Sequence, residues 1–110
     1  MNLNQWWDCV HPLAVELEKC IVTAPSDLPE YHIASIREGL PDLLQAIESF
    51  DCPDDARILR DCLVRSVTYL QHVYQALEND DESEVEFYYG NALTQIAQLH
   101  YHLVQVGFAT

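Results

Sequence analysis

Apolar and small residues recur at intervals of three and four along residues 85–106, and this pattern constrains the fold most. The stripe consists of Val85, Tyr89, Ala92, Ile96, Leu99, Leu103 and Val106. Steps of four and three alternate along it without interruption, which is the spacing that places side chains on one face of an α-helix. The segment therefore predicts a helix with one face committed to a protein core.

Three earlier segments carry the same spacing and predict three more helices of similar length. Residues 3–24, 29–50 and 54–79 each bear an apolar stripe with steps of three and four. Short turns rich in proline and acidic residues separate these segments. We therefore predict an all-α fold in which residues 1–110 form a single domain, an antiparallel up-down-up-down four-helix bundle.

Two prolines and one capping pattern add detail to this prediction. Pro12 and Pro41 lie inside the first and second helices, where each removes a backbone hydrogen bond, so we expect kinks near both. The alternatives are a restart of the first helix near His11 and a short break of the second helix at residues 39–41. Ser83 and Glu86 have the spacing of a capping box, which predicts that the last helix opens at Ser83.

The charge of the chain is strongly acidic. Eighteen Asp and Glu residues stand against five Lys and Arg residues, which gives a formal net charge of −13. Such a surface repels nucleic acid and anionic membranes and attracts basic proteins, so we predict no direct nucleic-acid binding and no membrane association. The four cysteines form no C-x-x-C pair and follow no signal peptide, which predicts reduced thiols and a cytoplasmic location.

The predicted topology gathers acidic residues at one end of the bundle. The turn between the first two helices and the turn between the last two lie at the same end of an up-down bundle. Their acidic residues, which we call the acidic pole, are Asp27, Glu30, Glu78, Asp80, Asp81, Glu82, Glu84 and Glu86. Helix dipoles favour acids at the start of the last helix, but they disfavour Glu78 and Asp80 at the end of the third. The surplus indicates either a binding surface for a basic partner or a solvated turn, and the sequence leaves both open.

A second stripe on the last helix carries no charge. We call it the uncharged face, and its members are Gly90, Thr94, Ala97, Tyr101, Val104 and Phe108. No Asp, Glu, Lys or Arg occurs from residue 87 to residue 110, although exposed helix faces ordinarily carry charges. Depletion of charge with aromatic residues retained is typical of interface cores. We expect this face to be buried in a homodimer or against a target, and an exposed polar face is the alternative.

Motifs that carry catalysis or cofactor binding are absent from the sequence. It contains no Gly-x-x-x-x-Gly-Lys, Gly-x-Ser-x-Gly or Gly-x-Gly-x-x-Gly segment and no Glu-x-x-His pair. His100 and His102 project about 200° apart on a helix and cannot share a metal within it. We therefore predict a protein that is not an enzyme and that holds no cofactor or metal. A ligand-binding bundle around His72, His100 and Cys62 is the least favoured interpretation.

Two classes of function fit these patterns. The first is a non-enzymatic acidic module that binds a basic protein or nucleoprotein complex and blocks its handling of nucleic acid. DNA-mimic-like inhibitors of nucleases, of restriction complexes and of CRISPR complexes (anti-CRISPR proteins) belong to this class, as do toxin-neutralising immunity proteins. The alternative is a structural or adaptor subunit, held in a larger assembly by the uncharged surface of the third and fourth helices.

Overall fold

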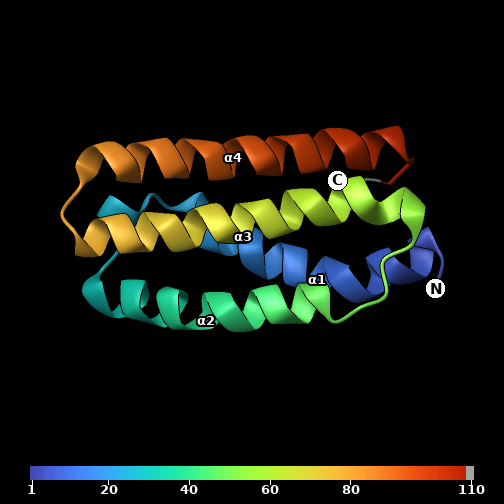
Figure 1. The fold of residues 1–110 in the computed structure, drawn as a ribbon, viewed down its shortest axis with the longest axis horizontal. Helices are drawn as coiled ribbons and strands as arrows, with labels where there is room; N and C mark the ends of the chain where they lie inside the picture. The colour runs from blue at the N-terminus through green and yellow to red at the C-terminus, as the bar shows by residue number, and fades with distance from the viewer. Residues whose placement is uncertain (109–110) are drawn as a thin grey trace.

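The computed structural model describes residues 1–108, and over that range it contains helices and no strand. Its elements are α1 (Leu3–Val22), η1 (Pro25–Asp27), α2 (Glu30–Glu48), η2 (Asp54–Ala56), α3 (Arg57–Glu78) and α4 (Glu82–Gln105). The four-helix, all-α prediction is therefore confirmed. The four α-helices lie along the long axis of a molecule that measures 43 × 23 × 19 Å, and each begins at the end where the preceding one stops (Figure 1).

Helix α1 begins with a capping box. The Asn2 side chain accepts a hydrogen bond from the Gln5 backbone N–H at 2.9 Å, and the Gln5 side chain accepts one from the Asn2 backbone N–H at 2.9 Å. The helix then continues through Pro12, and α2 likewise continues through Pro41. Neither proline interrupts its helix, and a bend at either position stays a prediction.

Helix α4 begins before Ser83, so the predicted capping box is wrong. The N-cap is Asp81, whose side chain accepts a hydrogen bond from the Glu84 backbone N–H at 3.1 Å. The Asp81 carbonyl also accepts the Val85 N–H at 3.0 Å. Asp81 takes this role because the chain turns away from α3 at Asp80, two residues past the end of that helix, where φ is 53°, and aspartate caps a helix as well as serine does.

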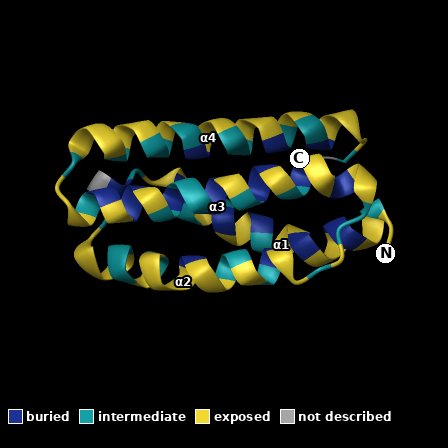
Figure 2. Cartoon of the chain, viewed as in Figure 1, coloured by how far each residue is buried: buried dark blue, intermediate teal, exposed yellow. Residues whose placement is uncertain are grey.

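The predicted stripes line the core, with α3 at its centre (Figure 2), except that Val106 lies just past the end of α4 and is 42% exposed. Helix α3 is buried over one broad face that covers about half of its circumference, and its buried residues are Leu59, Cys62, Leu63, Ser66, Val67, Leu70, Val73, Tyr74 and Ala76. By contrast, α2 buries only Leu40 and Ile47, and α4 buries Ala92, Leu99 and Leu103. Helices α2 and α4 are therefore outer helices that each offer one face to α3.

Two polar groups of core residues are buried without a partner in residues 1–108, the indole N–H of Trp6 and the hydroxyl of Tyr74. The Tyr74 side chain of α3 is 1% exposed, and within residues 1–108 its hydroxyl has no hydrogen-bond partner. Burial, together with the nearby Cys20 and Tyr89 groups, raises the pKa of Tyr74 to about 12. Because the hydroxyl loses its water on folding and gains nothing in return, it lowers the free energy of unfolding.

We predict that Tyr74→Phe raises the free energy of unfolding by about 1 kcal/mol at pH 7, because it removes the unpaired oxygen and keeps the ring. In the wild type, the folded protein retains the Tyr74 proton above pH 10, whereas the unfolded chain loses it. The free energy of unfolding therefore keeps its full value below pH 10 and falls as the pH rises toward 12.

Urea unfolding followed by circular dichroism measures both effects. Tyr74→Phe should lose less stability than the wild type between neutral and strongly alkaline pH. A variant that is less stable than the wild type at pH 7, or that shows the same alkaline loss, would contradict the prediction.

Candidate functional site

The acidic pole lies at the end of the molecule that holds both the α1–α2 connection and the α3–α4 turn (Figure 1). Asp27 ends η1, Glu30 begins α2 and Glu78 ends α3. The other five acidic residues belong to the α3–α4 turn and the beginning of α4. All eight except Asp81 are solvent-exposed, and Asp81 is half-buried.

The α3–α4 turn surrounds a hollow of about 310 Å³. Four acidic residues line it, and Leu77 and Val85 add apolar surface; the acidic residues are Asp80, Asp81, Glu82 and Glu86. A lysine or arginine side chain combines a hydrocarbon stem with a charged end, so it matches both parts of this lining. Chemically, the hollow suits a cationic side chain of a partner protein.

Asp80 occupies a backbone position that disfavours it. Its N–H donates to the Leu77 carbonyl at 3.2 Å, and the Asp81 N–H donates to the Ala76 carbonyl at 3.0 Å, which together form a Schellman motif. The residue with positive φ in this motif is usually glycine, because a Cβ atom crowds the backbone there. The Asp80 charge also lies at the negative end of the α3 dipole. Both effects lower stability, and helix capping does not explain the choice of aspartate.

Glu78 is the one member of the acidic pole that forms an ion pair within the described residues. The Arg37 guanidinium of α2 donates to its carboxylate and so links α2 to the end of α3. The two residues are 41 positions apart in the chain, so the ion pair joins segments that are distant in sequence. Their contact depends on how α2 and α3 pack, which local spacing does not reveal.

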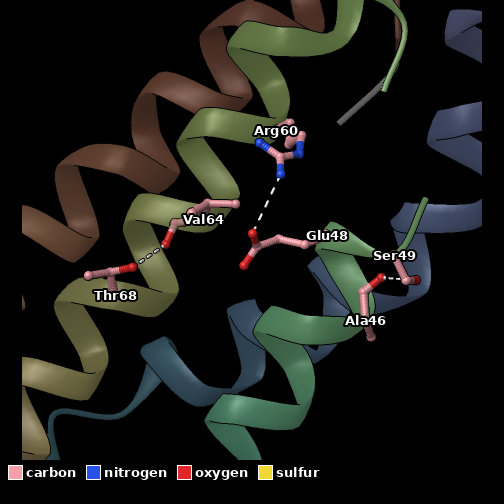
Figure 3. A network of polar contacts seen from close by, with 6 residues as sticks. All are labelled: Ala46, Glu48, Ser49, Arg60, Val64 and Thr68. Carbon is pink, nitrogen blue, oxygen red and sulfur yellow. Dashed lines mark hydrogen bonds and ion pairs between the residues drawn. The ribbon is translucent and has the colours of Figure 1, made fainter. Parts of the chain in front are cut away.

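Most of the basic side chains neutralise acids elsewhere. Arg60 of α3 reaches Glu48 at the end of α2 at 3.6 Å, beside intrahelical hydrogen bonds of Thr68 and Ser49 (Figure 3). Arg57 pairs with Asp54 at 3.1 Å, and Lys19 pairs with Glu16 at 3.4 Å. Apart from Arg37, no basic residue forms an ion pair with the acidic pole in residues 1–108, so the pole keeps most of its negative charge.

Five members of the uncharged face lie on the outer side of α4. Gly90, Thr94 and Ala97 are exposed, and Tyr101 and Val104 are 61% and 59% exposed. Phe87, which the predicted stripe omits, extends the same side toward the start of the helix and is 64% exposed. The described part of the chain therefore leaves a row of small and large uncharged side chains uncovered.

Phe108 does not belong to the uncharged face. Helix α4 ends at Gln105, and Gly107 has a φ of 90°. The Phe108 N–H donates to the Leu103 carbonyl at 2.9 Å, which turns the chain back. The ring centroids of Phe108 and Trp7 are then 5.8 Å apart. The helical spacing places Phe108 wrongly because it assumes that the helix continues past Gly107.

The remaining titratable residues are scattered. His72 stacks on Tyr88 with 4.8 Å between ring centroids, and His100 is hydrogen-bonded to Glu18. Burial raises the pKa of the Cys20, Cys52 and Cys62 thiols, whereas Cys9 is exposed. In residues 1–108 no three His, Cys, Asp or Glu side chains converge as metal ligands would. No helix of that range combines the length and hydropathy needed to cross a bilayer.

No protein-family model, curated protein or solved structure matches this chain. The functional proposal therefore rests on the charge, exposure and geometry of the described residues.

We predict that Asp80→Gly raises the free energy of unfolding by about 1 kcal/mol, because glycine adopts a φ of 53° without a Cβ clash and the change removes a charge from the α3 C-terminus. Thermal unfolding followed by circular dichroism measures the change. Gly107→Ala is the matched control, since its φ is also positive and an added Cβ meets nothing within 4 Å. The control should lose about 1 kcal/mol. An Asp80→Gly protein no more stable than the wild type would show that the aspartate is not strained.

Proposed function

We propose that this protein is a non-enzymatic binding module whose acidic pole covers a basic surface of another protein and so excludes nucleic acid from it. The observation that supports this most is the group of exposed carboxylates around the hollow bounded by Leu77 and Val85. The partner is a basic protein or nucleoprotein complex: a nuclease, a restriction or CRISPR complex, or a toxin that the module neutralises.

Rigid carboxylates can take the place of nucleic-acid phosphates on such a surface. The Schellman motif and the Asp81 cap hold the α3–α4 turn by backbone and side-chain hydrogen bonds, so its acidic residues start from a fixed frame. The net charge of −13 would also speed the encounter with a cationic partner. The proposal takes the helices as an up-down-up-down bundle, bent near Pro12 and Pro41, that acts in the cytoplasm.

Asp80 supports a binding role because an aspartate at this position lowers the free energy of unfolding. A strained backbone position filled by a charged residue is a reason to suspect function at that position. A solvated turn with no binding role would gain stability from glycine there. Contact with a cationic partner would explain why an aspartate is present instead.

A structural or adaptor subunit is the second candidate. The exposure of Phe87, Tyr101 and Val104 on α4 favours it, because a monomer gains nothing by leaving such side chains in water. In that case the acidic pole serves solubility alone, and neutralising it would leave assembly unchanged.

We predict that neutralising the pole weakens partner binding by at least about tenfold, because several charge-assisted contacts are lost together. The variant combines Asp80→Asn, Glu82→Gln, Glu84→Gln and Glu86→Gln and keeps Asp81, which caps α4. Immobilised wild-type protein is used to capture the partner from a lysate of the source organism. The captured partner is then titrated with a labelled DNA duplex, which the wild type should displace and the variant should not. Binding should weaken steeply as salt rises.

A control variant removes the same number of negative charges away from the pole. It combines Asp8→Asn, Asp42→Asn, Asp51→Asn and Asp61→Asn, all at exposed positions. The control should retain wild-type affinity. If both variants lose affinity equally, net charge alone is responsible, and if the pole variant binds normally, the proposed site is wrong.

A further inference from the structure

We propose that α4 pairs with α4 of a second copy of this chain, in antiparallel orientation. The contact is a row that we call the outer seam: Phe87, Gly90, Thr94, Ala97, Tyr101 and Val104. All six residues are exposed on α4, which forms one edge of the molecule (Figures 1 and 2). The inference concerns α4 alone and does not depend on what the acidic pole binds.

The spacing of the outer seam is that of a coiled coil. Its steps are three, four, three, four and three, so the row keeps to one side of the helix. Helix α4 already has an inner stripe, with Ala92, Leu99 and Leu103 buried against the rest of the protein. An outer helix of a bundle needs one such stripe, and a second uncharged one on the solvent side is expected where another helix packs.

The side-chain sizes along the seam select an antiparallel copy. When the two-fold axis passes between Gln95 and Ile96, Tyr101 faces the partner's Gly90 and Val104 faces the partner's Phe87. Thr94 then faces the partner's Ala97. In this register the bulkiest seam residue, Tyr101, meets the smallest, Gly90. In a parallel pair each residue would face itself, which would leave a gap at Gly90 and crowd two tyrosine rings at Tyr101. An isologous antiparallel contact therefore fills the seam evenly.

Packing within the single chain does not explain why residue 90 is a glycine. After proline, glycine is the poorest helix former, and Gly90 lies within α4. A Cβ atom added there would meet nothing within 4 Å, so no neighbour in the described residues requires the small side chain. A tyrosine from a second copy would require it, because the ring needs the space above the bare backbone.

Charge also favours a second copy in this orientation. Two molecules of net charge −13 repel each other least when the contact is free of acids, and residues 87–108 contain no Asp, Glu, Lys or Arg. Antiparallel helices place the two acidic poles at opposite ends of the pair. A parallel pair would place them side by side. A basic partner would instead bind the acidic pole, because the pole carries the negative charge. The uncharged surface therefore remains available for self-association.

Sedimentation equilibrium at protein concentrations up to about 200 µM tests the pairing. The wild type should reach twice the chain mass of 12.6 kDa. Gly90→Leu should raise the thermal stability of the monomer, because leucine favours helix, while raising the dimer dissociation constant at least about tenfold, because leucine fills the space for the partner's Tyr101. A structural role for Gly90 in the monomer would instead lower stability.

Two matched controls and a second variant accompany this measurement. Gly39→Leu makes the same change in α2, where an added Cβ also meets nothing within 4 Å, and should leave the dimer intact. Tyr101→Glu should abolish the dimer, whereas Tyr31→Glu, at a tyrosine that is 70% exposed on α2, should not. A wild type that remains monomeric throughout, or a dimer that Gly90→Leu and Tyr101→Glu leave unchanged, overturns the proposal.

Disulfide formation tests the orientation. Phe87→Cys and Val104→Cys proteins are prepared with the exposed Cys9 changed to serine. Their mixture should form a covalent dimer on oxidation, and neither protein alone should do so; self-linkage of Val104→Cys would overturn the antiparallel arrangement. Salt should strengthen this dimer by screening like charges, whereas it should weaken a complex formed by the acidic pole. The two proposals can therefore fail separately.

Discussion

The broad buried face of α3 is the constraint on which the rest of the structure depends. Its apolar side chains share one core with those of the other three helices, and α2 and α4 are outer helices with one face each in water. Burying an apolar side chain stabilises by roughly 1.5 to 3 kcal/mol, so this central helix dominates the packing. The exposed row on α4 and the sharp turn that ends α3 both follow from its position.

The helices were predictable because their signal is local. The spacing of apolar residues predicts helices at 3–24, 29–50 and 54–79, and the structure has them at Leu3–Val22, Glu30–Glu48 and Arg57–Glu78. Burial on one side of a helix repeats every three or four residues whatever the neighbours are. The ends were harder to predict. Asp81 rather than Ser83 opens α4, because the backbone of Asp80 determines which residue is available as a cap.

The candidate site was predictable only in part, for a related reason. Short connections are enough to bring the acidic residues to one end, but the hollow beside Leu77 depends on the shape of a single turn. The ion pair between Arg37 and Glu78 joins two helices, and spacing within either helix says nothing about it. Phe108 was misplaced and Phe87 missed because a stripe does not reveal where its helix stops.

Asp81 forms hydrogen bonds at two helix ends, and this limits which residues of the surrounding surface can be substituted. Its N–H closes α3 on the Ala76 carbonyl, and its side chain opens α4 by accepting the Glu84 N–H. A substitution there disturbs two helix ends together, whereas Glu82 and Glu86 have no such tie among the described residues. If the binding partner changes during evolution, we therefore expect substitutions at Glu82 and Glu86, whereas Asp81 should be retained because it holds both helix ends.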